Sequence, residues 1–352
     1  MTVFDVKQDI WRYLQQANKP IVLYGMGNGG DKLIAVLESY GLTPVAVFAS
    51  DDFVRGQSFH GFKVKRLCDI EHEYKDFIIL VAFAAGYREL IDKLYNIAEK
   101  HELYAPDLPV YGDGLFNLEY LQENESSIRQ VYSLLSDEQS RNIYNQILLY
   151  KLSGDISLLK GIATTREQDF AEIVKPSSDE VYLDLGAYDG DTVEQLLKHT
   201  RGVKRILAVE PDTRNFRKLS AKFEGSTAVE LYNVGAWECD TQLNFSAKAG
   251  RQSSLGEGKL TPMRSVDSLL AGENATYIKL DVEGAEAKAL TGARQTIEKY
   301  KPKLEVALYH RNEDIFELPL MVAKMHSGYK LYIRKQPYIP AWEINLYANN
   351  NY

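Results

Sequence analysis

The 352-residue sequence contains only two cysteines, Cys68 and Cys239, and neither belongs to a CxxC pair. A disulfide framework and a cysteine-rich zinc site both need more cysteines than this, so the sequence excludes both. No run approaches the roughly 18 consecutive apolar residues that a membrane-spanning helix requires. Residues 1–16 carry charged side chains where a secretory signal peptide has an apolar core. We therefore expect a cytoplasmic protein with no membrane partner.

Basic clusters are also scarce. The chain has 41 Lys and Arg against 49 Asp and Glu, which gives a formal net charge of −8. General nucleic-acid binding depends on a basic face, so we expect no nucleic-acid partner. The hydrophobic share of 45% is ordinary for a globular protein. Because the chain exceeds the length at which one core usually keeps growing, we expect at least two domains.

The most informative segment is VYLDLGAYDGDT, residues 181–192. It predicts a buried strand, a glycine turn and a helix that begins near Asp191. Such a turn leaves backbone N–H groups and the positive end of the helix dipole facing a cleft. The next predicted strand ends at Glu210, 24 residues after Gly186, where a carboxylate can accept hydrogen bonds from both hydroxyls of a ribose. Together they predict a site for a ribose-bearing ligand.

The glycine spacing indicates which ligand this is. Dinucleotide-binding folds use GxGxxG so that the backbone can approach a pyrophosphate, but here Tyr188 stands where a close-approach glycine would be needed. A ligand without a pyrophosphate, such as S-adenosylmethionine, suits this turn better. Asp184 could meet the ammonium of its amino-acid tail, directly or through water. The predicted cofactor-binding residues are Asp184, Gly186, Tyr188, Asp189, Gly190, Asp191, Thr192, Glu210 and Pro211.

A second cluster of polar residues follows two later strands. TYIKLDVEGAE, residues 276–286, predicts a strand that ends at Asp281, followed by Glu283, a glycine and a helix. The apolar run 304–309 ends at His310. The carboxyl ends of parallel strands line one crevice of an open sheet. We therefore expect four strand-end residues to converge on one cleft: Asp184, Glu210, Asp281 and His310.

Five segments in this order resemble the FkbM-type family of S-adenosylmethionine-dependent methyltransferases: VYLDLGAYDGDT, AVEPD, NVGAW, IKLDVEGAE, and YHRNEDIFELP with WEINLYA. The resemblance covers about residues 166–352, and IKLDVEGAE is its most specific part. It implies O-methylation of a hydroxyl, often on a sugar, a polyketide or another natural-product scaffold. Members of the family often carry a small or amide residue at the position of Tyr188, so this residue is a departure.

Transfer to a hydroxyl requires that the acceptor oxygen is aligned behind the activated methyl carbon and that its proton is removed. His310 is the predicted general base because imidazole titrates nearest neutrality, with Asp281 and Glu283 as alternatives. The three residues could also hold a divalent cation, since oxygen-rich sites suit magnesium. Structural roles are equally open: Glu283 could cap the next helix, and His310 could be a satisfied strand-end histidine.

The N-terminal part shows a similar pattern. The predicted strand 20–24 runs into Gly25, Gly27 and Gly30, which satisfy GxGxxG, and a helix follows at once. Further strands are expected at 45–49 and 77–83, and a helix at 87–101. Strands alternating with helices predict a parallel, Rossmann-like domain.

The role of this N-terminal glycine turn is open. The glycines could lie under a phosphate with Asp51 or Asp52 on a ribose, or they could only permit close packing of a helix on the strands. If a nucleotide-linked sugar binds there, the second domain could methylate that sugar. NAD is an alternative ligand.

The predicted fold class is α/β with two Rossmann-like domains. We expect an N-terminal domain over 1–112, a helical connector over 113–178, and a seven-stranded class I methyltransferase fold over 179–352. The connector has a capping pattern at Ser136 with Gln139 three residues on, and the polar segment 246–258 is a candidate lid. The seven strands are expected near 181–185, 205–210, 228–233, 276–281, 303–309, 329–334 and 343–348.

Three classes of function fit these patterns. We favour an S-adenosylmethionine-dependent methyltransferase with a small-molecule acceptor, such as a sugar or nucleotide-sugar. An NAD-linked oxidoreductase or epimerase using residues 25–30 is weakened because no Tyr-x-x-x-Lys pair follows that turn. A non-catalytic nucleotide-binding protein on a methyltransferase fold is the third class. The exposed first domain also suggests a homodimer.

Overall fold

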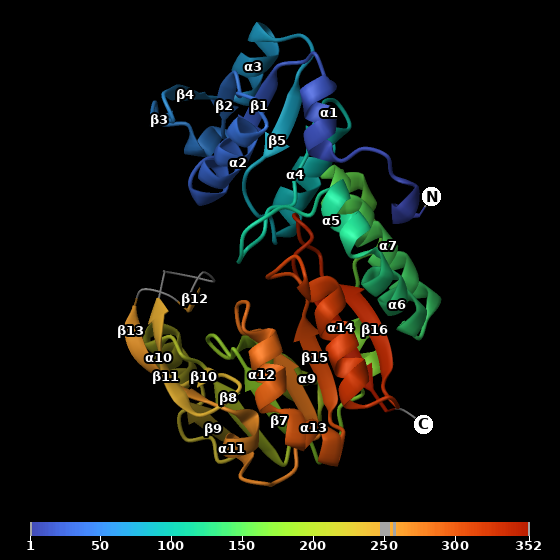
Figure 1. Ribbon diagram of the computed structural model, residues 1–352. Coiled ribbons are helices and arrows are strands. Elements are labelled where there is room, and N and C mark those ends of the chain that lie inside the picture. Colours follow the sequence, from blue (N-terminus) through green and yellow to red (C-terminus); the bar gives the residue numbers. More distant parts are fainter. Residues whose placement is uncertain (1, 247–253, 256–257, 351–352) are drawn as a thin grey trace.

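Two α/β units lie one above the other and are joined along one side by helices (Figure 1). The structure, a computed structural model, describes residues 2–246, 254–255 and 258–350. The N-terminal unit contains the elements up to β6, the joining helices follow, and the C-terminal unit contains those from η3 onward. The joining helices are α5 (Leu118–Glu123), α6 (Glu125–Leu134) and α7 (Glu138–Ser153).

A six-stranded sheet in the order β3-β4-β2-β1-β5-β6 forms the N-terminal unit, and all neighbours except β3 and β4 pair in parallel. The strand order reverses between β1 and β5, which makes this pair the switch point of the sheet. Its strands are β1 (Ile21–Tyr24), β2 (Ala46–Phe48), β3 (Ser58–Phe59), β4 (Phe62–Lys65), β5 (Ile78–Val81) and β6 (Glu102–Tyr104).

The helices of this unit are η1 (Val3–Asp5), α1 (Ile10–Gln16), α2 (Asn28–Ser39), η2 (Asp51–Phe53), α3 (Leu67–Glu73) and α4 (Arg88–Ala98). The three expected strands are present as β1, β2 and β5. Every residue of β1 and β5 is buried, as is typical of a parallel sheet covered on both faces. Strand β4 was missed because it is short and only Val64 is buried in it.

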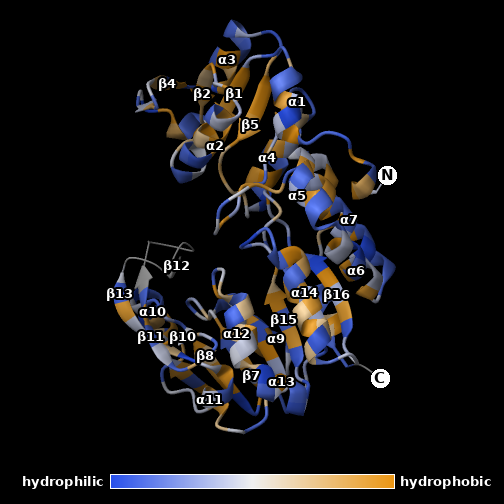
Figure 2. Cartoon of the chain, viewed as in Figure 1, coloured by the Kyte–Doolittle hydropathy of each residue, from blue (hydrophilic) through white to orange (hydrophobic). Residues whose placement is uncertain are grey.

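The C-terminal unit contains all seven expected strands, in the order β16-β17-β15-β14-β7-β8-β9. Within this sheet β17 alone runs in the direction opposite to the other six strands, and the mainly parallel sheet confirms the expected α/β fold class. The strands are β7 (Val181–Leu185), β8 (Arg205–Val209), β9 (Val229–Tyr232), β14 (Tyr277–Leu280), β15 (Lys303–Ala307), β16 (Lys330–Lys335) and β17 (Ile344–Asn349). In Figure 2 the central strands β1 and β5 of the N-terminal sheet are mostly hydrophobic.

Helices of this part are η3 (Ile156–Leu159), α8 (Arg166–Asp169), η4 (Phe170–Val174), α9 (Asp191–His199), α10 (Thr213–Lys222), α11 (Val266–Leu270), α12 (Glu286–Gly292), α13 (Arg294–Tyr300) and α14 (Asp314–Met325). A small second sheet, absent from the sequence prediction, follows β9. Its strands are β10 (Gly235–Ala236), β11 (Thr241–Ser246), β12 (Ser254–Leu255) and β13 (Lys259–Arg264). The candidate lid 246–258 falls largely outside the described residues.

Helix α7 covers β16, the edge strand of the C-terminal sheet. The hydroxyl of Ser136 accepts the Leu331 N–H at 3.0 Å, and that of Ser140 accepts the Ile333 N–H at 3.0 Å. These contacts satisfy edge groups that would otherwise be open to another strand. The predicted cap at Ser136 is wrong by one residue, because Asp137 accepts the Ser140 N–H at 2.7 Å and begins the helix.

The two units also meet directly. Ala85, after β5, pairs with Ile339, between β16 and β17, through N–H···O bonds of 2.6 and 2.9 Å. Tyr111 N–H donates to the His310 carbonyl at 2.9 Å. Both contacts place loops of the N-terminal unit against the carboxyl ends of C-terminal strands. Among the described residues, no helix is both long and apolar enough to span a membrane.

Candidate cofactor and catalytic site

A cavity, here called the C-terminal cavity, opens at the carboxyl ends of β7, β8 and β14. Six of the nine predicted cofactor-binding residues line it: Gly186, Tyr188, Asp191, Thr192, Glu210 and Pro211. The other three, Asp184, Asp189 and Gly190, are not on its wall. Of the predicted catalytic residues, Asp281 and Glu283 line the cavity, and His310 does not.

The turn after β7 requires glycine at its first position. Gly186 has φ +83°, and a Cβ there would lie 1.9 Å from the carbonyl oxygen of Asp281, which follows the neighbouring strand β14. Any side chain would therefore push the two strand ends apart. Tyr188 has φ +50°, a conformation that few residues other than glycine adopt. This path directs the Tyr188 N–H toward the tip of β8.

Glu210 accepts the hydrogen bond from the Tyr188 N–H. One carboxylate oxygen accepts from Tyr188 at 2.9 Å and the other from Asp212 at 2.8 Å. The residue is only 6% exposed, and burial raises the pKa of Glu210 to about 7. Each carboxylate oxygen can accept more than one hydrogen bond. Glu210 can therefore accept two hydroxyl donors and still hold the glycine turn in place.

Asp184 lies beneath the turn and is fully buried. Its carboxylate lies 3.2 Å from the Lys279 ammonium and accepts a hydrogen bond from the Thr192 hydroxyl. Burial raises the pKa of Asp184, and Lys279 partly offsets that rise. The ion pair joins β7 to β14, and the Thr192 hydrogen bond holds the first turn of α9 to β7. Contact of Asp184 with the ammonium of a cofactor stays a prediction, because this carboxylate already has two partners.

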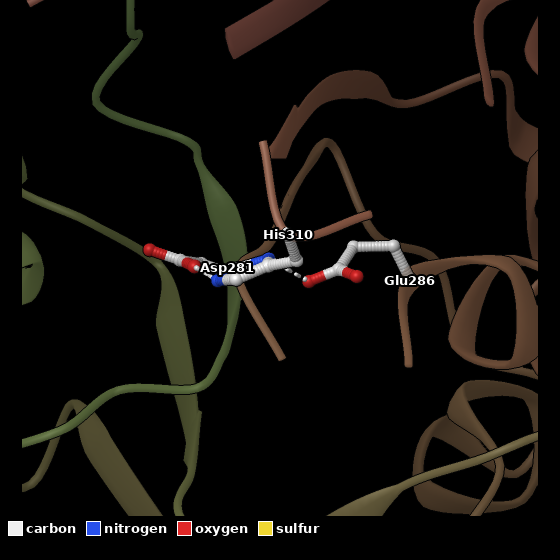
Figure 3. Close-up of side chains that lie close together, drawn as sticks. All are labelled: Asp281, Glu286 and His310. Atoms are coloured by element: carbon white, nitrogen blue, oxygen red, sulfur yellow. Dashed lines mark ion pairs between the residues drawn. The ribbon is translucent and has the colours of Figure 1, made fainter. Parts of the chain in front are cut away.

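His310 lies between carboxylates on either side of its ring (Figure 3). Nδ1 is 2.9 Å from Glu286 Oε1, within ion-pair distance. Nε2 is 3.4 Å from Glu283 Oε2 and 3.6 Å from Asp281 Oδ1. His310 is 1% exposed. The His310 side chain therefore lies behind the residues that line the cavity.

The charges around His310 change its expected role. Burial alone would lower the pKa of His310, but Glu286, Glu283 and Asp281 outweigh it and hold that pKa well above the usual value. An imidazolium has no lone pair with which to accept a proton. As placed, His310 thus positions the carboxylates beside it. This argues against the general-base role that the sequence predicts for it.

Asp281 and Glu283 are the alternatives, and their side chains are 26% and 27% exposed. Burial raises the pKa of Glu283, which brings it closer to the working pH of a general base. Asp281 lies 3.3 Å from the Tyr309 hydroxyl and 3.9 Å from the Lys279 ammonium. Both contacts already engage the Asp281 carboxylate. Glu283 is consequently the better candidate base.

Asp281, Glu286 and His310 offer ligand atoms within 4.8 Å of one another, which is close enough for a divalent cation. The geometry fits a cation poorly. His310 directs its two nitrogens to carboxylates on opposite sides, so both nitrogens are already engaged by ion pairs. The three residues form a chain of ion pairs (Figure 3).

Several residues of the wall escaped the sequence analysis. Lys279 carried a signal, because a lysine inside the buried run YIKL needs a charge partner. No sequence pattern indicated Tyr111 or Arg166, because both precede β7 in the chain and only the folded structure brings them to the cavity wall. Arg166 is held by Glu305 at 2.5 Å.

Residues 184–338 match the family model of the methyltransferase FkbM domain, which confirms the resemblance. A solved structure of methyltransferase FkbM from Methylobacillus flagellatus KT superposes with a TM-score of 0.73 at 19% identity. The superposition covers 94% of this chain and 90% of the chain of that structure. At this identity the likeness shows the fold, and it extends over both units.

Two further structures are more distant and support no argument on function. An rRNA methylase from Streptococcus thermophilus has a TM-score of 0.35 at 11% identity, covering 49% of this chain and 87% of its own. Aeropyrum pernix fibrillarin, solved with natively bound S-adenosyl-L-methionine, has a TM-score of 0.34 at 13% identity. The match covers 52% of this chain and 71% of the fibrillarin chain. No curated protein sequence matches the chain.

Proposed function

We propose, from the methyltransferase FkbM domain at residues 184–338, that this methyltransferase uses S-adenosylmethionine and methylates a hydroxyl of a small-molecule acceptor. A sugar or another natural-product scaffold is the acceptor that the family resemblance favours. The observation that carries the proposal is Glu210, buried on the cavity wall beside the Gly186 turn. A carboxylate in this position suits a ribose, and the turn leaves no place for a pyrophosphate-binding glycine.

The chain's own residues support binding and proton removal. Gly186 permits the close approach of the turn, and Glu210 accepts the ribose hydroxyls. The acceptor oxygen bonds the methyl carbon while the carbon–sulfur bond breaks, its electron pair stays on sulfur, and the hydroxyl proton passes to Glu283. His310, as an imidazolium, keeps Glu283 and Asp281 side by side despite their like charges.

Calorimetric titration with S-adenosylhomocysteine tests the cofactor assignment. We expect micromolar binding to the unmodified chain and a loss of at least about tenfold in Glu210→Ala, since hydrogen bonds to a charged group contribute about 1.5–3 kcal/mol. Glu224→Ala is the matched control, because Glu224 is exposed and absent from the cavity wall. Thermal unfolding of both variants verifies that they fold.

Two outcomes would overturn the proposal. The first is equal binding of S-adenosylhomocysteine to Glu210→Ala and to the unmodified chain. The second is binding of NAD in place of S-adenosylhomocysteine, which would move the functional centre to residues 25–30.

A further inference from the structure

A second cavity, here called the N-terminal cavity, has a volume of about 500 Å³. Its walls come from the residues just after β1, β5 and β6, among them Met26, Phe83 and Pro106. This is the crevice at the carboxyl ends of the strands, where the order of the N-terminal sheet reverses between β1 and β5. Open α/β sheets bind ligands at this position. The volume lies within the usual range for small-molecule sites.

The charge of this wall differs from that of the rest of the chain. Among the described residues that line the N-terminal cavity, Lys32 is the only charged one, and no carboxylate is present. The chain as a whole carries a net charge of −8. A cavity free of acids in an acidic protein favours an anionic ligand.

The first turn of α2 forms part of the same wall. Asn28 and Gly29 begin this 12-residue helix and line the cavity, so its N-terminal N–H groups and dipole lie beside the ligand space. Gly27 has φ +85°, and a Cβ there would meet no atom within 4 Å. Gly27 itself is not on the cavity wall, so a phosphate in the cavity would meet the backbone of Asn28 and Gly29.

Lys32 adds a positive charge one turn further along α2. Its ammonium donates to the carbonyls of Pro109 and Val110 at 3.1 and 3.3 Å. An ammonium has three N–H donors, so these two bonds leave one for a ligand. Most of the remaining wall is apolar, including Phe83, Leu108 and Trp342, which suits a flat or hydrophobic body attached to the anion.

Tyr111 connects this cavity to the methyl-transfer site. It lines both the N-terminal and the C-terminal cavity, and its N–H donates to the carbonyl of His310. Tyr111 therefore lies between the ligand space at α2 and the cavity that Asp281 and Glu283 line. The residues that would contact an NAD ribose, Asp51 and Asp52, are exposed and are not on the wall.

We propose that the N-terminal cavity binds the nucleoside-diphosphate part of the methyl acceptor, with its phosphates at the first turn of α2 and Lys32 and its other end directed past Tyr111 into the C-terminal cavity. This inference rests on the proposed function, because it names the acceptor class of that methyltransferase. It assigns the two cavities to the two substrates.

Calorimetric titration with UDP and ADP, each alone and each with saturating S-adenosylhomocysteine, tests the assignment. We expect at least one nucleoside diphosphate to bind, and Lys32→Ala to weaken it about tenfold while leaving the affinity for S-adenosylhomocysteine unchanged. Lys63→Ala is the matched control, since Lys63 is exposed on β4 and absent from the wall. Ala84→Phe fills the cavity from a small lining residue and should abolish nucleotide binding by steric exclusion.

Contrary results are distinguishable. The assignment is wrong if neither nucleotide binds, if Lys32→Ala binds as tightly as the unmodified chain, or if nucleotide competes with S-adenosylhomocysteine for one site. Inorganic pyrophosphate that binds as tightly as UDP would overturn the nucleoside part of the proposal. Failure of S-adenosylhomocysteine alone to bind would instead contradict the proposed function.

Discussion

The two units build the same strand–glycine–helix turn and surround it differently. After β7, the turn faces Glu210, a buried carboxylate that accepts the Tyr188 N–H. After β1, the corresponding turn faces an acid-free cavity, and Asp51 and Asp52 are exposed in η2. The comparison shows that a glycine turn fixes only the backbone path. The tip of the neighbouring strand and the charge of the wall decide what binds.

Close packing at the switch point is common to both units. A Cβ on Gly186 would lie 1.9 Å from the Asp281 carbonyl oxygen, and one on Gly29 would lie 2.1 Å from that of Ala82. In each case the oxygen follows the strand across the switch point, β14 beside β7 and β5 beside β1. Each turn thus depends on one glycine that touches the neighbouring strand end.

The largest expected effect comes from breaking that contact in one unit. Gly186→Ala must displace the end of β14, so we expect no measurable binding of S-adenosylhomocysteine and a lower midpoint of thermal unfolding. Gly225→Ala is the control, because Gly225 has a similar φ of +77° but open space around its Cβ. Both variants incur about 1–2 kcal/mol of backbone strain. Equal binding by the two variants would show that the overlap at Gly186 is unimportant.

Gly29→Ala is the counterpart in the N-terminal unit. The substitution should displace the loop after β5 and abolish nucleoside-diphosphate binding, while S-adenosylhomocysteine still binds. Calorimetry with both ligands on one preparation measures this directly. Loss of both affinities together would mean that the units do not bind their ligands independently.

The next largest effect concerns the acid-rich wall of the C-terminal cavity. Glu283→Gln removes the proposed base without changing its size, so we expect methyl transfer to slow by roughly 10²–10⁴-fold. Affinity for S-adenosylhomocysteine should stay unchanged, because the ribose contact belongs to Glu210. Rates measured across pH would show, in the variant, loss of the low-pH limb on which protonation of the base slows methyl transfer. An unchanged rate would assign proton removal to Asp281 or to another group.

The strands of both units and the cofactor turn of the C-terminal unit were predictable from the sequence. The buried strands were visible as short apolar runs, and the Gly186–Glu210 pair as a local spacing. The role of His310 was not, since its charge depends on Glu286, which begins a helix 24 residues earlier in the chain. Tyr111 escaped for the same reason: its place between the cavities follows from packing of the two units.

A moderate effect should appear with pH. Burial raises the pKa of Glu210 to about 7 in the unliganded protein. Ribose hydroxyls donate to the ionised carboxylate, so binding stabilises that form and lowers the pKa. Affinity for S-adenosylhomocysteine should therefore be full above pH 7 and fall below it, by at most about tenfold per pH unit. Calorimetry at several pH values measures it, and in Glu210→Gln the dependence should disappear. A persistent dependence would point to another titrating group.

The smallest expected effect compares Tyr188 with Gly27, two turn residues with φ of +50° and +85°. Glycine adopts this conformation freely, whereas tyrosine is strained by about 1 kcal/mol. Tyr188→Asn, with a residue that tolerates the left-handed region, should raise stability by up to that amount in thermal unfolding. Affinity for S-adenosylhomocysteine should change less than about twofold, because Tyr188 serves Glu210 through its backbone N–H, which asparagine retains. A loss of affinity beyond about tenfold, or 1.4 kcal/mol, would instead mean that the ring itself contacts the ligand and that this departure from the family pattern is functional.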